Sequence, residues 1–139
     1  MTSPAGRTVA FRVVGHDPSR PLVIDPVLTF STYLGGSGNE RGYGIAVAPD
    51  GTVGITGNTN STNFPTKNPF QGTFGGGDSD AFLALFNPGG SSLALSTYLG
   101  GSAWDGGEAI AASKDGRFCA VGQASSSNFP LVDAIQPAF

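Results

Sequence analysis

Two carboxylates, Asp78 and Asp80, flank Ser79 directly after a run of three glycines. Calcium takes oxygen ligands that loops supply, so this pair is a candidate cation site. The spacing is not that of an EF-hand and no distant glutamate completes the ligand set, which favours an ordinary turn before a strand. Calcium therefore stays open as a ligand, and no other cofactor is expected.

The other reactive residue types do not form a catalytic set. His16 is the only histidine and Cys119 the only cysteine, which argues against a zinc cluster and an internal disulfide. No Gly-x-Ser-x-Gly elbow is present, and the glycine runs at 35–38 and 75–77 match neither a dinucleotide fingerprint nor a P-loop. We therefore expect a protein that is not an enzyme. Cys119 stands in an apolar run and is expected to be a small buried residue of a strand.

The composition excludes several classes of protein. Lys and Arg number 7 against 10 Asp and Glu, a net charge of −3, which excludes a nucleic-acid binder that relies on a basic stripe. Glycine (22) and proline (10) punctuate all 139 residues, which excludes a long helical bundle and indicates a turn-rich β protein. No apolar run approaches the roughly 18 residues of a membrane span, and residues 1–7 lack the basic-then-apolar layout of a signal peptide.

The strongest signal is an internal repeat, in which the heptapeptide Ser-Thr-Tyr-Leu-Gly-Gly-Ser at 31–37 recurs at 96–102. The step that carries Tyr33 onto Tyr98, which we call the repeat offset, also pairs many later positions when it is kept without a gap. About 19 of the 44 paired positions are identical. A fixed period of this kind indicates tandem copies of one supersecondary unit.

Within one period the sequence predicts four short strands, at residues 43–47, 53–57, 81–86 and 93–99. A Pro-Asp-Gly turn at 49–51 joins the first two, and the second copy repeats that hairpin around an Asp-Gly pair. Tandem four-stranded units with such regular turns describe the blades of a β-propeller. The expected fold class is therefore all-β, a partial (incomplete) β-propeller made of four-stranded antiparallel blades.

The repeat divides the chain into three segments. Residues 1–26 form a strand-like lead-in, with strand patterns at 9–14 and 22–24. Residues 27–99 hold the last strand of a preceding blade, placed at 27–34, followed by the first full blade, and residues 100–139 hold a second, incomplete blade. One and a half blades cannot close a ring. The chain is therefore expected to be covered by neighbouring blades of a longer polypeptide, to self-associate into a ring, or to persist as a marginal small β domain.

The combined motifs resemble the bacterial SBBP repeat, the seven-bladed β-propeller repeat. They are the two Ser-Thr-Tyr-Leu-Gly-Gly-Ser copies, Arg-Gly-Tyr-Gly-Ile-Ala-Val at 41–47, Ile-Thr-Gly at 55–57, Asn-Phe-Pro at 63–65 and Asn-Pro-Gly-Gly at 87–90, after a lead-in from residue 17. This resemblance covers one and a half to two repeats. It implies a propeller in a large bacterial protein that is secreted or attached to the cell surface, and it transfers no catalytic residue.

Propeller packing leads to two expectations about buried positions. Tyr33 and Tyr98 are equivalent in the repeat and are expected between blades, in like surroundings, with ligand contact as the alternative. Val47 is expected at a core position, so Ala112 in the second copy removes apolar bulk there.

The loops after the Gly-Gly-Ser motifs are the expected contact sites, because loops on a rigid scaffold carry recognition. They hold Glu40 and Arg41 in the first copy and Trp104 and Asp105 in the second, and Trp104 suits stacking on a sugar or anchoring a protein. The function expected is a non-enzymatic scaffold for protein or glycan interaction, without nucleic acid and without a membrane span. The alternatives are a calcium-dependent adhesion module, and part of a propeller enzyme such as a glycosidase or lyase.

Overall fold

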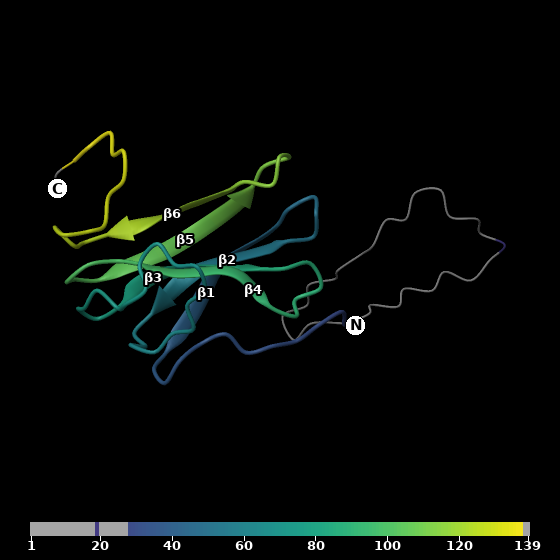
Figure 1. Cartoon of the computed structure of the whole chain (residues 1–139), viewed down its shortest axis with the longest axis horizontal. Coiled ribbons are helices and arrows are strands. Elements are labelled where there is room, and N and C mark those ends of the chain that lie inside the picture. Colours follow the sequence, from purple (N-terminus) through teal and green to yellow (C-terminus); the bar gives the residue numbers. More distant parts are fainter. Residues whose placement is uncertain (1–18, 20–27, 138–139) are drawn as a thin grey trace, which may run out of the picture.

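The computed structural model describes Ser19 and residues 28–137, and that part of the chain is all-β (Figure 1). No described helix is long or apolar enough to cross a membrane. The lead-in at 1–26, with its strand patterns and His16, lies outside the described residues apart from Ser19. The strands are β1 (Glu40–Val47), β2 (Val53–Thr59), β3 (Asp80–Phe86), β4 (Leu93–Leu99), β5 (Asp105–Ala112) and β6 (Phe118–Ala124).

Strands β1 to β4 form one antiparallel sheet in the order β1-β2-β3-β4, so each strand pairs with the next along the chain. The register places Ile45 opposite Ile55, Ile55 opposite Ala84, and Ala84 opposite Ser96. The four strands predicted from the sequence are confirmed, and the first module, as we call this repeat unit, is a four-stranded meander. Strands β5 and β6 form a separate antiparallel pair that belongs to the second module.

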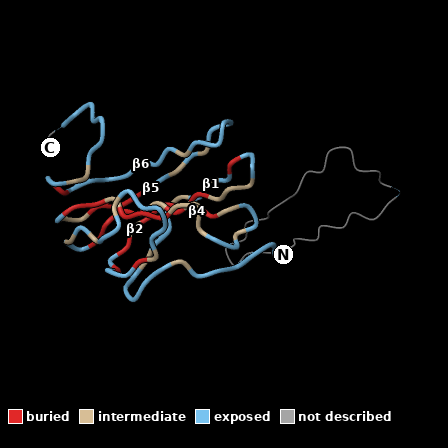
Figure 2. Tube along the Cα trace, viewed as in Figure 1, coloured by how far each residue is buried: buried red, intermediate tan, exposed pale blue. Residues whose placement is uncertain are grey.

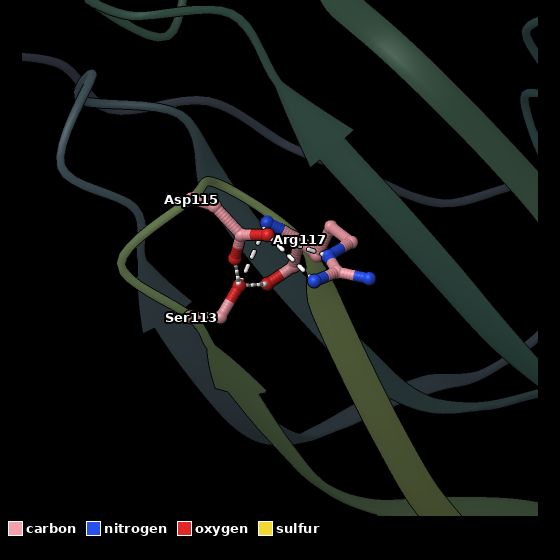
Figure 3. Close-up of polar contacts among 3 residues, drawn as sticks. All are labelled: Ser113, Asp115 and Arg117. Carbon is pink, nitrogen blue, oxygen red and sulfur yellow. Dashed lines mark hydrogen bonds and ion pairs between the residues drawn. The ribbon is translucent and has the colours of Figure 1, made fainter.

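The two Asp-Gly turns close their hairpins in the same way. Gly51 and Gly116 have φ of 88° and 82°, a left-handed backbone that glycine adopts at little cost. In the second module the turn is reinforced by side chains (Figure 3): the Asp115 carboxylate accepts from Ser113 Oγ and pairs with the Arg117 guanidinium at 2.7 Å. The predicted turn chemistry is therefore confirmed in both copies.

A β-bulge recurs at the same place in both hairpins, between Gly42 and Gly44 in β1 and between Gly107 and Ala109 in β5. The partner strand must carry glycine opposite each bulge. A Cβ at Gly57 would lie 1.8 Å from the Arg41 carbonyl oxygen, and a Cβ at Gly122 would lie 2.1 Å from the Gly106 oxygen. The spacing that the two copies share thus preserves a backbone geometry that side chains would block.

The core lies on one face of the four-stranded sheet, where Phe64, Phe82, Ala84 and Tyr98 form a buried cluster. The long segment between β2 and β3 supplies Phe64, whose ring centroid lies 4.8 Å from that of Phe82. Tyr98 makes the connection specific: its hydroxyl accepts from Phe64 N at 2.8 Å and donates to the Ser61 carbonyl at 2.6 Å. The segment between β2 and β3 therefore covers one face of the sheet to which those two strands belong.

The β5–β6 hairpin stacks on the opposite face of the first module, over β1 and β2 (Figure 1). Glycines make the close approach possible, because a Cβ at Gly54 would lie 2.6 Å from the Phe118 ring and 3.0 Å from Ile110 Cδ1. A Cβ at Gly44 would lie 3.0 Å from the backbone of Ala109. The structure thus shows face-to-face stacking of two β modules, and within the described residues the four- and two-stranded sheets are open.

Tyr33 and Tyr98 lie in unlike surroundings, contrary to expectation. Tyr98 is 1% exposed and lies inside its own module, between β4 and the segment that holds Phe64, rather than between modules. Tyr33 is fully exposed, at 103%. The physical reason is that the equivalent of the covering segment, with the strands that would flank Tyr33, does not precede it among the described residues.

Three further expectations fail because the segments concerned have no neighbouring module among the described residues. Residues 28–34 form no strand, because no described strand lies beside them to complete a sheet. Val47 is 63% exposed rather than in the core. Cys119 does lie in a strand, β6, but it is exposed, and most of β6 is pale blue in Figure 2. Val47 and Cys119 lie on outer sides of the two-module stack, whereas Leu34 packs against the buried core cluster.

Candidate functional site

The carboxylate of Glu40, one of the predicted contact residues, is used inside the first module. Its Oε2 accepts from Gly36 N at 3.2 Å, and its Oε1 accepts from Thr59 Oγ1 at 2.7 Å and from Ser61 Oγ. Glu40 begins β1, and Thr59 ends the paired strand opposite it. The side chain therefore ties the Gly-Gly-Ser loop to the open end of the β1–β2 hairpin.

Asp105 holds the matching position in the second module, one repeat later. It is fully buried, and its carboxylate accepts from Gly101 N at 2.8 Å, Ser125 N at 2.9 Å, Ser126 N at 3.3 Å and Ser126 Oγ at 2.6 Å. A carboxylate that accepts this many hydrogen bonds has no atom left for a partner molecule. The structure thus places Asp105, like Glu40, in the framework of the loop rather than on its contact surface.

An asparagine completes each loop. Asn63 Oδ1 accepts from Ser37 N at 2.8 Å and Ser37 Oγ at 3.0 Å, and Asn128 Oδ1 accepts from Ser102 N at 2.9 Å and Ser102 Oγ at 3.0 Å. The repeated Asn-Phe-Pro and Gly-Gly-Ser elements are therefore two halves of one hydrogen-bonded structure, present in both modules.

A polar hollow of about 290 Å³ lies at the junction of the two modules, beside the open end of the β1–β2 hairpin. It is lined by Asn39, Arg41, Asn58, Asn60, Asp78, Ser79 and Trp104. Three residues singled out from separate parts of the sequence, Arg41, Asp78 and Trp104, are thus brought to one site. The other predicted residues are elsewhere: Tyr98 is in the core with its hydroxyl used, and Tyr33 is exposed away from the hollow.

Sequence reasoning missed the amide residues of this hollow. Asn39 and Asn60 are linked at the mouth of the β1–β2 hairpin, where Asn60 Oδ1 accepts from Asn39 N at 2.7 Å. Asn58 lies opposite Arg41 in the hairpin register. The signal was available, because counting pairs back from the turn at Asp50-Gly51 places the three asparagines beside Arg41 at one end of the hairpin.

The chemistry of the hollow is that of recognition through hydrogen bonds and stacking. Asparagine amides donate and accept, the Asp78 carboxylate accepts, and the Arg41 guanidinium donates. Trp104 adds an indole that packs over Gly106, where a Cβ would lie 2.7 Å from Cη2. Among the described residues, Asp78 is the one carboxylate in the lining. The site is equipped to hold a polyhydroxylated ligand.

Asp80 belongs to a different place and does not line the hollow with Asp78. It is completely buried; its Oδ2 accepts from Gly75 N at 2.6 Å and Gln71 Nε2 at 3.3 Å, and its Oδ1 has no partner. Burial, with a smaller contribution from the nearby Asp105, raises the pKa of Asp80 to about 6. Among the residues that the structure describes, no group of three or more His, Cys, Asp or Glu could hold a metal ion.

No protein-family model matches this chain, and no curated protein matches it either. The geometry of the hollow and of the module stack therefore carries the assignment of function.

Proposed function

We propose that this chain is a non-enzymatic binding scaffold that presents the polar hollow at its module junction to a glycan. The observation that carries the proposal is the convergence of Trp104, Arg41 and Asp78 with three asparagines in one hollow. Residues from both modules line it, so the stack of sheets holds the binding groups in place. Rigid support of this kind lowers the entropic cost of ordering a site on binding.

A glycan suits the lining better than a phosphate-rich polymer does. Sugar hydroxyls both donate and accept hydrogen bonds, as asparagine amides do, and the apolar face of a sugar ring stacks on an indole. The volume of about 290 Å³ is at the small end of ligand pockets, which suits the terminal residue of a glycan chain. A phosphate-rich polymer is disfavoured by the net charge of −3.

The wider setting that we propose is a blade segment of a β-propeller in a bacterial secreted or cell-surface protein. Its support is the likeness of the motifs to the SBBP repeat, together with two observations: a four-stranded antiparallel module and a second module stacked on it face to face. Further modules packed on the two ends of this stack would bury the apolar faces that it leaves open, as repeat proteins require.

The experiment uses the single tryptophan of the chain, which lines the hollow. The purified protein is screened on a glycan array, and each hit is titrated by Trp104 fluorescence and by calorimetry. We expect the wild-type protein to give a saturable binding signal by both methods. Asp78→Asn and Trp104→Ala should not bind the glycan, and calorimetry follows Trp104→Ala because that variant has no tryptophan. Phe70→Ala, which removes an exposed aromatic residue outside the hollow, is the matched control and should bind normally.

Two results would overturn the proposal. An array without any hit removes the glycan as ligand, and release of reducing ends from a bound polysaccharide would replace the scaffold with the glycosidase or lyase alternative. Repeating the titration with a calcium chelator separates the remaining alternative, because an adhesion module that needs calcium would lose binding when the ion is removed.

A further inference from the structure

Among the described residues, no strand or segment packs on the apolar sheet surfaces at the two ends of the module stack. One, which we call the leading face, consists of Tyr43, Ile45, Val47 and Val53 on β1 and β2. Its first three residues are 55%, 68% and 63% exposed. The other, the trailing face, consists of Ala109, Ala111, Cys119 and Val121 on β5 and β6, all exposed. Val121 is 61% exposed.

The interior of the same molecule shows how two such surfaces fit. Between the modules, Ile110 and Phe118 of the second lie against Gly54 of the first. A Cβ at Gly107 would lie 2.1 Å from Thr56 Oγ1, so that glycine accommodates the threonine. This buried contact serves as a template. Each of its residues can be replaced by the residue at the equivalent position of the other copy.

The repeat offset maps the buried contact onto the exposed faces. Ile110 and Phe118, which enter the contact from the second module, correspond to Ile45 and Val53 on the leading face. Gly54 and Thr56, which receive them, correspond to Cys119 and Val121 on the trailing face. Each exposed face is thus the copy of a surface that the chain buries elsewhere.

The substitutions between the copies compensate one another in size. On the surface that receives side chains, the small Gly54 is replaced by the larger Cys119. On the surface that inserts them, the large Phe118 is replaced by the smaller Val53. Thr56 becomes Val121, which has the same shape, and the glycine opposite it, Gly107, becomes Gly42. A partner with unrelated residues would have no reason to match these changes. The complementarity therefore selects a module of this repeat as the occupant.

We infer that the leading face of one copy of this chain docks on the trailing face of a second copy, head to tail. The docked modules continue the stacking that β5–β6 begins on β1–β2, and the contact buries apolar surface that soluble monomers rarely leave open. Because the two faces differ, the contact is heterologous and generates a closed ring or an open array. It is independent of the polar hollow, whose lining contains no residue of either face.

Sedimentation velocity over a range of protein concentrations provides the first test. The wild-type chain should form species larger than a monomer as the concentration rises. Ile45→Asp on the leading face and Val121→Asp on the trailing face should each give only monomers, since a charge in a buried contact is costly. Ile135→Asp, at a fully exposed residue outside both faces, is the matched control and should assemble like the wild type. Circular dichroism verifies that each variant is folded.

Mixing the two monomeric variants tests the head-to-tail geometry. Ile45→Asp keeps an intact trailing face and Val121→Asp an intact leading face, so an equimolar mixture should form a dimer and stop there. A wild-type chain that stays monomeric at every concentration would overturn the inference. So would assembly that survives either substitution, or a mixture that remains monomeric.

Cross-linking tests the register, because the shifted template places position 53 of one copy against Cys119 of the next. Under mild oxidation with diamide, Val53→Cys should form a ladder of disulfide-linked copies, whereas Ile135→Cys should not. Equal cross-linking of the two variants would count against the proposed contact, and a ladder specific to position 53 supports it even if an aspartate variant fails to fold.

Discussion

Glu40 and Asp105 hold the same position in two successive modules and play the same part there with side chains of different length. Each accepts a hydrogen bond from the second glycine of its Gly-Gly-Ser loop, at 3.2 Å from Gly36 N and at 2.8 Å from Gly101 N. Each also binds the serine after its hairpin, Ser61 or Ser126. The shorter aspartate is fully buried. Substitution of Asp105 should therefore reduce stability more than substitution of Glu40.

Asp105→Ala should destabilise the second module by at least about 3 kcal/mol, because several buried donors lose their acceptor together. Hydrogen exchange should show faster exchange of the amides of Ser125 and Ser126. Asp115→Ala is the matched control in the exposed turn of the same hairpin, and it should leave both the melting temperature and the exchange nearly unchanged. Equal effects of the two variants would show that the buried carboxylate does not organise the loop.

Tyr98→Phe should lower the free energy of unfolding by about 1–3 kcal/mol, because removal of the hydroxyl leaves Phe64 N and the Ser61 carbonyl buried without their partner. Tyr33→Phe makes the same chemical change at the equivalent, fully exposed position and should have an effect within about 0.5 kcal/mol. Urea denaturation of both variants measures the difference. Equal losses would mean that the two tyrosines are in like surroundings after all.

Gly101→Ala should destabilise the fold by about 1–3 kcal/mol, as overpacking does in other buried sites. The added Cβ would lie 2.4 Å from Asn128 Oδ1 and 2.6 Å from Ser126 Cβ. At Gly72 the nearest atom to an added Cβ is 3.5 Å away, in ordinary contact, so Gly72→Ala is the control and should be tolerated. Thermal melting of the two variants decides the matter, and a tolerated Gly101→Ala would contradict the close packing of this loop.

Asp80 should make the protein more stable as the pH falls through about 6, its pKa in the folded state. Its pKa is raised above the ordinary 3.8, so the folded state binds the proton more tightly than the unfolded state does. The gain is complete near 3.8 and amounts to at most about 3 kcal/mol. Below that pH, Asp50 and Asp115 act in the opposite sense, because hydrogen bonds lower the pKa of each.

Urea denaturation at a series of pH values measures the contribution of Asp80. Asp80→Asn should abolish the gain in stability, because an amide does not titrate in this range. Asp78→Asn, at an exposed position close by in the chain, should keep it. A pH dependence that persists in Asp80→Asn would assign it to another group.

The sequence was sufficient for the fold wherever local signals and the repeat agreed. The Asp-Gly turns and the alternation around Ile45 and Ile55 predicted the hairpins, and the repeat offset predicted that the second copy follows the first. These signals are local or periodic, so they do not depend on what lies around the module.

Burial was less predictable, because it depends on neighbours that the repeat implies and the described chain does not contain. Val47, Cys119 and Tyr33 were assigned to buried places on the assumption that both faces of every sheet are covered, and all three are exposed. The candidate site was predicted in part. Arg41, Trp104 and Asp78 converge, whereas the buried Asp105 shows that a polar residue next to a loop can belong to the loop's own support.

The short loop at 100–102 is bound from both modules: Gly100 N donates to Gln71 Oε1 at 3.0 Å, and the next two amides donate to Asp105 and Asn128. Gly36 and Ser37 make the matching bonds in the preceding copy. Duplication of a gene segment one period long would therefore keep such a loop together with the side chains that bind it. Insertion or loss of a single codon within it would separate the donors from their acceptors. Genes that encode this repeat should therefore gain and lose whole repeat units during evolution.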